Sequence, residues 1–297
     1  MELKVHKSVL LYEAIEYLKC EKKKLILDCT VGAAGHAREI LKRLPPGGRV
    51  IGIDADKGAL EIARVNLKDF ENSSFSLINA NFKDFDKVLS DLKIGRVDGM
   101  LFDLGISSIQ LDDESRGFTF LKSGPLDMRM DQDTGKPLWQ VLRTLSEREL
   151  GEIIRDLGEE RYWRKIAKKI RSEEKQEPIQ DSKRLAEIIR ETVGYRTKGK
   201  IDPSTRTFQA LRIFVNDELG SIKETLRKVS SFLNPGARVV VISFHSLEDR
   251  IVKHVFRGMA KEEKVKILTK KPITPSIEEI SQNPRSRSAK LRACERI

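Results

Sequence analysis

Residues 25–36 read LILDCTVGAAGH, a short apolar run followed by a turn of small residues. Residues 25–27 predict a buried strand, and residues 37–44 predict a helix with one apolar face. Small residues between a strand and a helix let the backbone approach a nucleotide-like ligand, which meets the free N–H groups of the helix. The stretch therefore predicts the first strand, ligand-binding turn and helix of an α/β domain, with an ordinary tight turn as the alternative.

The alternation of strand and helix continues beyond this turn. A second helix is predicted at residues 57–67, and apolar runs predict further strands at residues 50–53, 75–78, 97–102 and 239–242. The tail supplies two closing strands, at residues 265–268 and 290–295. This order is typical of a mostly parallel sheet wrapped by helices, an α/β fold.

The strand pattern breaks between residues 111 and 205, where charged helical stretches alternate with glycine- and proline-containing loops. We therefore expect a discontinuous ligand-binding domain made of residues 1–110 and 206–297. A helical substrate-recognition domain, residues 111–205, is expected to be inserted into it.

Composition restricts the partners and the compartment. The 297-residue chain has a formal net charge of +11, which favours a polyanionic partner such as nucleic acid, although a solvated surface rich in Lys and Glu is the alternative. Cys20, Cys29 and Cys294 are scattered, without disulfide or metal-ligand spacing, so we expect a reducing, cytoplasmic compartment and no metal. No apolar stretch approaches the length of a membrane span, so no membrane is expected as a partner.

Polar and aromatic residues mark the ends of the predicted strands. Asp54 ends the second strand, where an acidic side chain accepts hydrogen bonds from ribose hydroxyls. Phe82 follows the third strand and can flank an adenine, and Asp103 ends the fourth. Open α/β sheets bind ligands at these strand ends, although Asp54 could instead cap a helix and Phe82 could belong to the core.

The turn itself distinguishes between two nucleotide-like cofactors. A dinucleotide site favours a G-x-G-x-x-G turn that cradles pyrophosphate. This turn carries Thr30, Gly32 and Ala34 and is led by Asp28. That arrangement looks more like the turn of class I methyltransferases, whose cofactor, S-adenosylmethionine, has no phosphate.

Longer motifs resemble the bacterial 16S ribosomal RNA cytosine-N4 methyltransferases over nearly the whole chain. They are His6 with residues 9–11, then residues 28–36, 103–112, 116–118, 124–131, 206–212, 243–250 and 283–292. The chain departs from the family pattern at Ala34, where glycine is usual, and at Ser8, where proline is usual.

This resemblance implies a Rossmann-like class I methyltransferase fold and S-adenosylmethionine as the cofactor. It also implies that the substrate is a cytosine in the decoding region of 16S ribosomal RNA, within the small ribosomal subunit. The implied cofactor contacts are Ala34, Gly35, His36, Asp54, Phe82, Asp103 and Gln110, and we add Gly32 of the turn.

Methylation of the cytosine amino group calls for a hydrogen-bond acceptor, because the nitrogen lone pair is delocalised into the ring. Asp103 occupies the first position after the fourth strand, so we expect it to contact the acceptor base as well as the cofactor. The alternative is that Asp103 only anchors the cofactor. His245 follows the fifth strand, beside Ser243 and Glu248. It is a second candidate for contact with the target base, and the alternative is that it has only a structural role. Ring C5 methylation would need a cysteine nucleophile, and no cysteine stands directly after the fourth strand.

Two basic clusters are candidate RNA contacts. Arg161, Arg164, Lys165 and Lys168 lie beside two aromatic residues in the insert, and Arg285 and Arg287 lie near the C-terminus. Arginines beside aromatics can hold phosphates and stacked bases, although a solvated helix face is the alternative. Two other functions remain open, a DNA amino-methyltransferase and a nucleotide-binding RNA chaperone without catalysis.

Overall fold

A computed structural model describes residues 8–194 and 202–297 of the chain. The chain divides into two compact units: the sheet unit, Met1–Gly105 with Leu219–Ile297, and the helical unit, Ile106–Glu218. These divisions differ from the expected boundaries at residues 110 and 206. Helix α10 (Ser204–Asn216) packs on α7 (Glu147–Gly158). Because of this packing, the helical unit extends as far as Glu218.

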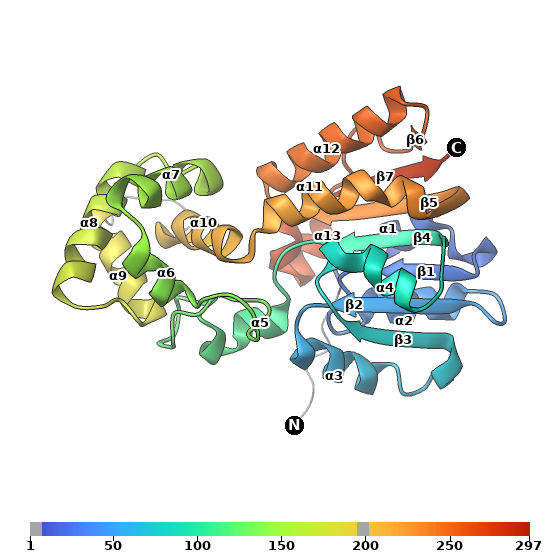
Figure 1. Cartoon of the computed structure of the whole chain (residues 1–297), viewed down its shortest axis with the longest axis horizontal. Helices are drawn as coiled ribbons and strands as arrows, with labels where there is room; N and C mark the ends of the chain where they lie inside the picture. The colour runs from blue at the N-terminus through green and yellow to red at the C-terminus, as the bar shows by residue number, and fades with distance from the viewer. Residues whose placement is uncertain (1–7, 195–201) are drawn as a thin grey trace. The chain divides into compact units, whose positions relative to one another are not determined.

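The sheet unit contains a seven-stranded sheet with the strand order β3-β2-β1-β4-β5-β7-β6 (Figure 1). Strands β1 to β5 pair in parallel, whereas β7 runs antiparallel to both β5 and β6. The strands are β1 Leu25–Asp28, β2 Arg49–Asp54, β3 Phe75–Asn79, β4 Val97–Asp103, β5 Leu233–Ser243, β6 Val265–Ile267 and β7 Lys290–Arg296. The predicted mostly parallel α/β sheet is confirmed.

Helices cover both faces of this sheet. Successive strand side chains point to opposite faces, so Leu27 packs in one buried cluster and Ile26 in the other. One face packs against α1 (Leu11–Leu18), α2 (Gly35–Arg43) and α3 (Lys57–Asn66). The other packs against α4 (Phe85–Asp91), α11 (Glu218–Lys228) and α12 (Ser246–Lys261). Burial of both faces explains why these strands read as continuous apolar runs.

Strand β5 begins earlier than predicted. Leu233 pairs with Val97, and the register then shifts so that Arg238 pairs with Gly99. The intervening residues form a bulge in which Gly236 adopts a φ of 73°. The strand therefore extends through a bulge, since extra residues on one strand bend it without ending the pairing.

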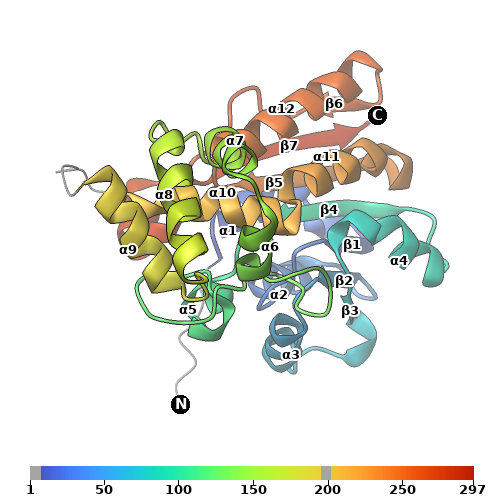
Figure 2. The same cartoon turned by 60° about the vertical axis from the view of Figure 1, so that its left-hand side comes forward.

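The helical unit has its own core. Its described elements are helices (Figure 2), joined by loops, the 3₁₀ helix Glu114–Arg116 and an isolated bridge between Pro125 and Asp181. The remaining helices are α5 Ser108–Asp112, α6 Leu138–Thr144, α8 Trp163–Gln176 and α9 Ser182–Val193. Among the described helices of either unit, none is long and apolar enough to cross a membrane.

Candidate functional site

Three carboxylates lie at one edge of the sheet. Asp28, Asp54 and Asp103 are the last residues of the parallel strands β1, β2 and β4. Asp28 is almost fully buried, and its Oδ1 accepts the N–H of Thr30 at 3.2 Å. Within the part of the chain that the structure describes, Asp28 Oδ2 and Asp103 Oδ1 are buried without a hydrogen-bond partner. Most buried polar atoms are paired, so these two oxygens are candidate ligand contacts.

Asp54 shapes the turn between β1 and α2. Its Oδ2 accepts the N–H of Gly32 at 2.8 Å, and its Oδ1 accepts the N–H of Asp56 at 2.9 Å. The helix that follows is capped by Asp56, whose side chain accepts from Gly58 and Ala59, so Asp54 does not cap it. Each carboxylate oxygen keeps a second lone pair, and the role of Asp54 toward a ribose stays a prediction.

The small residues of the turn meet the N-terminal segment. Ala34 precedes α2 with a φ of 66°, a conformation that favours the glycine usual in the resembling family. A Cβ at Gly35 would lie 2.0 Å from Ser8 Oγ, so Gly35 has no room for a side chain. Ser8 therefore packs on the turn, whereas His6 lies outside the described residues.

His36 and Thr30 connect the turn to β4. The buried His36 places Nε2 at 3.1 Å from the carbonyl oxygen of Val9 and Nδ1 at 3.6 Å from Asp103 Oδ2. The N–H of Asp103 donates to Thr30 Oγ1 at 2.6 Å. Sequence reasoning assigned Thr30 only to the turn, because a contact over 73 residues leaves no local signal.

Burial raises the pKa of all three carboxylates. Burial raises the pKa of Asp103 well above its usual range, and the charges of Asp28 and Glu248 add to this. Burial also raises the pKa of Asp28 to about 7, although the hydrogen bond from the N–H of Thr30 lowers it. Burial raises the pKa of Asp54 to about 6, although the hydrogen bonds from the N–H groups of Asp56 and Gly32 lower it. A cationic ligand at this edge would offset the cost of ionising these groups.

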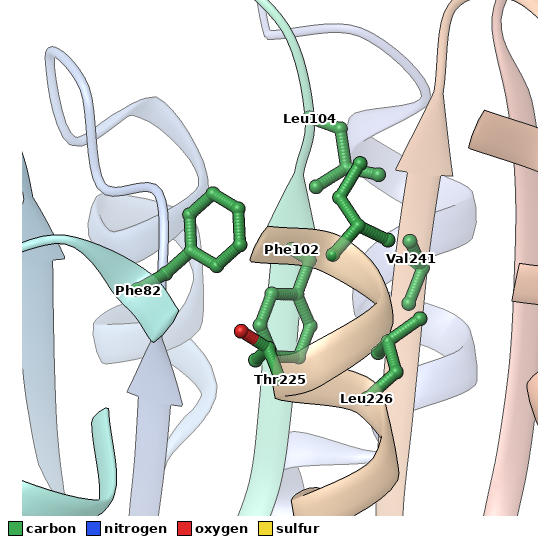
Figure 3. Close-up of a pocket in the computed structure, with 7 residues that line it drawn as sticks. Phe82, Phe102, Leu104, Thr225, Leu226 and Val241 are labelled. Carbon is green, nitrogen blue, oxygen red and sulfur yellow. The ribbon is translucent and has the colours of Figure 1, made fainter. Parts of the chain in front are cut away.

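Phe82 lies beside an apolar pocket (Figure 3). Its ring meets Phe102 edge to face, with centroids 6.2 Å apart, and remains half-buried. The other lining side chains come from β5, the segment after β4 and α11: Leu104, Val241, Ile222, Thr225 and Leu226. Phe82 thus packs on the core yet is exposed enough to flank an adenine, and that role stays a prediction.

His245 and Glu248 lie together where β5 ends. His245 is the N-cap residue of α12, and its Nε2 is 3.2 Å from Glu248 Oε1. Glu248 is fully buried, and its Oε2 accepts the N–H groups of Phe244 at 2.7 Å and His245 at 3.4 Å. Ser243 is buried as well and donates to the carbonyl oxygen of Lys290 at 3.3 Å.

Gln110 lies in the helical unit. It is buried in α5, where its Oε1 accepts the N–H of Ser107 and its N–H donates to Ser107 Oγ, both at 3.1 Å. These contacts form a capping box, which stabilises the start of a helix. A cofactor contact at Gln110 stays a prediction.

The basic cluster of α8 is exposed. Arg161, Arg164, Lys165 and Lys168 are exposed, and no acidic side chain within the described ranges forms an ion pair with them. Trp163 is covered instead, because the guanidinium carbons of Arg164 and Arg155 lie 4.1 and 5.3 Å from its ring centroid and Gly151 of α7 packs against the ring. Tyr162 is 37% exposed, and the guanidinium carbon of Arg161 lies 5.1 Å from its ring centroid.

Arg285 and Arg287 lie at the carboxylate edge of the sheet. Both are exposed in a 3₁₀ helix, Pro284–Ser288, directly before β7. Strand β7 runs antiparallel to β5, so Lys290 at its start pairs with Ser243 at the end of β5. The second basic cluster therefore lies on the sheet unit, at the edge that carries Asp103.

The carboxylate edge fits the cofactor expected from the sequence. S-adenosylmethionine carries a sulfonium and an ammonium group, and the unpartnered oxygens of Asp28 and Asp103, among the described residues, can accept or neutralise such cations. The left-handed backbone at Gly32 and Ala34 brings main-chain atoms to the same edge.

Comparisons with known proteins identify the family of the chain. The chain matches the model of the MraW methylase family over residues 4–297. It is 49% identical over 296 residues to ribosomal RNA small subunit methyltransferase H of Thermotoga neapolitana, covering 98% of this chain and 96% of that protein. The protein of that name from Syntrophus aciditrophicus is 46% identical over 309 residues, covering 98% of each chain.

The fold also has a counterpart among solved structures. A structure from Clostridium thermocellum, described there as a candidate rRNA-methylase, superposes with a TM-score of 0.50 at 13% identity. The match covers 99% of this chain and 100% of that one. At this identity the likeness concerns the fold alone, a Rossmann-like class I methyltransferase fold.

Proposed function

This chain belongs to the MraW methylase family, and we propose that it methylates the N4 amino group of a cytosine in the decoding region of 16S ribosomal RNA. It is a methyltransferase, and its cofactor is S-adenosylmethionine. The relatives that cover nearly the whole chain are named for the ribosomal RNA of the small subunit, which supports this substrate. Family membership also favours an enzyme over the chaperone alternative.

The observation that carries the proposal is the pair of buried carboxylate oxygens without hydrogen-bond partners, Asp28 Oδ2 and Asp103 Oδ1, within the described edge of the sheet. The bound cofactor supplies a methyl group on a positively charged sulfur. Asp28 and Asp103 would hold its cationic groups, Asp54 its ribose and Phe82 its adenine. Gly32, Ala34, Gly35 and His36 would form the turn that holds it, and Gln110 is a further proposed contact.

Asp103 would also orient the cytosine amino group. A carboxylate oxygen accepts an amino hydrogen, which increases electron density on the nitrogen and aims its lone pair at the methyl group. The N–H of Asp103 is held by Thr30, and its Oδ2 faces His36. The backbone of Asp103 is thus fixed, and Oδ1, which has no hydrogen-bond partner among the described residues, would accept from the amino group beside the cationic cofactor. His245 is the second proposed contact to the base.

The RNA would be bound by exposed cations on both units. Arg161, Arg164, Lys165 and Lys168 form a surface that is not neutralised by acidic neighbours within the described ranges. Arg285 and Arg287 place positive charge at the edge where the methyl group is transferred. We propose that the helical unit recognises the substrate and that the target base is turned out of the RNA to reach Asp103.

The proposed setting is the bacterial cytoplasm, with 16S ribosomal RNA inside the small ribosomal subunit as partner. Three buried, free cysteines are compatible with a reducing compartment. The two proposed sites carry opposite charges. Carboxylates suit a cationic cofactor, and the arginines and lysines suit phosphates, which supports RNA as substrate.

Labelled cofactor tests the proposal directly. The protein is incubated with S-adenosylmethionine carrying a labelled methyl group and with free 16S ribosomal RNA, assembled small subunits or duplex DNA. We expect the label on the N4 of one cytosine of 16S ribosomal RNA, identified by mass spectrometry of nuclease fragments. Label on DNA alone would support the DNA amino-methyltransferase instead, and label on a ring carbon would contradict amino methylation.

A further inference from the structure

We propose that Glu248 is a positioning residue that holds His245 as the base for the proton released on methylation of the cytosine amino group. This inference rests on the proposed function, because methylation of the cytosine amino group releases a proton. It adds Glu248 to the proposed mechanism and gives separate roles to two other residues. Asp103 orients the amino group, and His245 takes its proton.

The contacts between the two side chains define the arrangement. Glu248 Oε2 is held by the N–H groups of Phe244 and His245, at 2.7 and 3.4 Å. The other oxygen, Oε1, lies 3.2 Å from His245 Nε2. This 3.2 Å contact meets the distance of an ion pair but not the geometry of a hydrogen bond, and a carboxylate fixed by backbone donors can orient the imidazole ring with Nε2 toward Glu248. The Nδ1 lone pair then faces away from Glu248.

Both ring nitrogens of His245 are without a hydrogen-bond partner within residues 8–194 and 202–297, and the side chain is only 9% exposed. Nε2 lies beside Glu248, which leaves Nδ1 for a ligand. A buried ring nitrogen without a partner is unusual in a folded protein. A hydrogen bond from a substrate amino group would satisfy it, and such bonds often tighten only when substrate is bound.

The pair lies beside the residue proposed to orient the acceptor. Strand β5 pairs in parallel with β4, with Ile242 opposite Asp103, and the N–H of Leu104 donates to the carbonyl oxygen of Ile242 at 2.9 Å. His245 follows Ile242 by three residues. The charge of Glu248 also contributes to the raised pKa of Asp103.

The proton balance of the step is complete without another reactant. The amino nitrogen forms a bond to the methyl carbon, and the methyl–sulfur bond breaks with its electron pair staying on sulfur. The nitrogen then carries an excess proton, which moves to Nδ1 of His245. The imidazolium that forms lies against the carboxylate of Glu248, and the proton leaves to water when the product departs.

A double-mutant cycle in the full-length protein separates this role from a structural one. His245→Ala should lower the single-turnover rate at saturating cofactor by about 10²-fold, the lower range of a general base. Glu248→Gln, which keeps an oxygen for the backbone N–H groups, should lower the rate by about 10-fold or more. The double variant should be no slower than His245→Ala, because residues that act as one unit are not additive.

Rescue supplies the second readout. Added imidazole should restore part of the rate of His245→Ala, whereas it should restore none to Asp103→Asn, in which the base is intact. Binding of cofactor and of 16S ribosomal RNA, measured by calorimetry and filter binding, should change less than about 3-fold in Glu248→Gln, because its effect is on the chemical step.

Glu149 offers a matched control for loss of the capping charge. It occupies the same third helical position in the capping box of α7, where its Oε2 accepts the N–H of Ser146 at 2.8 Å. Glu149→Gln therefore makes the same chemical change at the same helical position in the other unit. It should leave the single-turnover rate as in the unsubstituted protein.

The outcomes distinguish this inference from the proposed function. If the unsubstituted protein puts no methyl on a cytosine amino group, the proposed function fails, whatever the variants do. If it does, two results overturn the positioning role. One is a normal rate in Glu248→Gln. The other is a double variant slower than His245→Ala by the same factor by which Glu248→Gln alone slows the unsubstituted protein. If Glu248→Gln unfolds, imidazole rescue of His245→Ala decides whether His245 is the base, and absence of rescue overturns the proposal.

Discussion

The carboxylate edge of the sheet unit and the basic cluster of α8 are both groups of like charges. They differ in how far each charged side chain is buried. Asp28 is buried, Asp54 and Asp103 are half-buried, and burial raises the pKa of each. Arg161 and Lys165, by contrast, extend into solvent. A buried like-charge group is costly unless a counter-charge arrives, whereas an exposed one costs little and acts at long range.

This difference indicates two kinds of ligand. The buried edge suits a small cation held in a defined geometry, which is the cofactor. The exposed cluster suits a polyanion held with little geometric demand, which is the RNA backbone. Substitutions at the edge should therefore change chemistry and affinity sharply, and those on α8 should change salt dependence gradually.

The largest effect is expected at Asp103. Asp103→Asn keeps the shape of the side chain but removes the charge, so it should lower the single-turnover methylation rate by about 10²-fold at saturating cofactor. Quenched-flow measurement with labelled cofactor follows this rate. A normal rate would leave Asp103 only an anchoring role and would weaken the assignment of the buried edge to catalysis.

Asp54 should affect binding more than chemistry. Asp54→Ala removes the acceptor for the N–H of Gly32 and for the proposed ribose contact, so the cofactor should bind about 1.5–3 kcal/mol more weakly. Isothermal titration calorimetry measures this loss, and Asp54→Asn, which keeps one acceptor oxygen, should lose less. Unchanged affinity in Asp54→Ala would remove Asp54 from the site.

The pH dependence of stability tests the burial of the edge. The pKa of Asp28 is about 7 in the folded protein against 3.8 as its usual value, so the folded state without cofactor binds more protons between these values. The free energy of unfolding should fall as pH rises through this window, by about 1.4 kcal/mol per pH unit from this group. Asp54, with a pKa of about 6, should add in the same direction.

Denaturant titrations between about pH 4.5 and 7.5 measure this fall. Saturating S-adenosylmethionine should reduce it, because a bound cation favours the ionised carboxylates. Asp28→Asn should flatten the curve. A flat curve in the unsubstituted protein would show that these carboxylates are solvated, and the contrast with α8 would disappear.

The smallest effect per residue is expected on α8. Replacement of Arg164, Lys165 and Lys168 by Gln keeps helix propensity nearly constant, so folding and cofactor affinity should not change. The slope of log RNA affinity against log salt should fall by about 0.7–0.9 for each phosphate that is no longer neutralised. Arg164 and Lys168 lie one turn apart and should contribute together, whereas Lys165 lies about 100° round the helix and should contribute less.

Filter binding at several salt concentrations gives that slope. Arg285→Gln with Arg287→Gln provides the comparison at the edge of the sheet unit. If the α8 variant keeps the original slope, its cations are a solvated helix face, and RNA binding must come from the C-terminal cluster or another surface.

The sequence by itself determined the sheet, the turn and the positions of the strand-end residues. Short apolar runs at regular intervals, each followed by a polar or glycine residue, can form only a few kinds of fold, and parallel strands bring their carboxyl ends to one edge. Asp28, Asp54 and Asp103 can therefore be assigned to that edge from the order of residues alone.

Only the tertiary structure decided which polar atoms are satisfied. Asp56 rather than Asp54 caps α3, Gln110 closes a capping box, and Trp163 is covered by α7 and two arginines. The register of β5 and the contact between Thr30 and Asp103 likewise depend on partners far away in the chain. Hydrogen bonding and burial are properties of pairs of residues, and a local pattern specifies only one member of each pair.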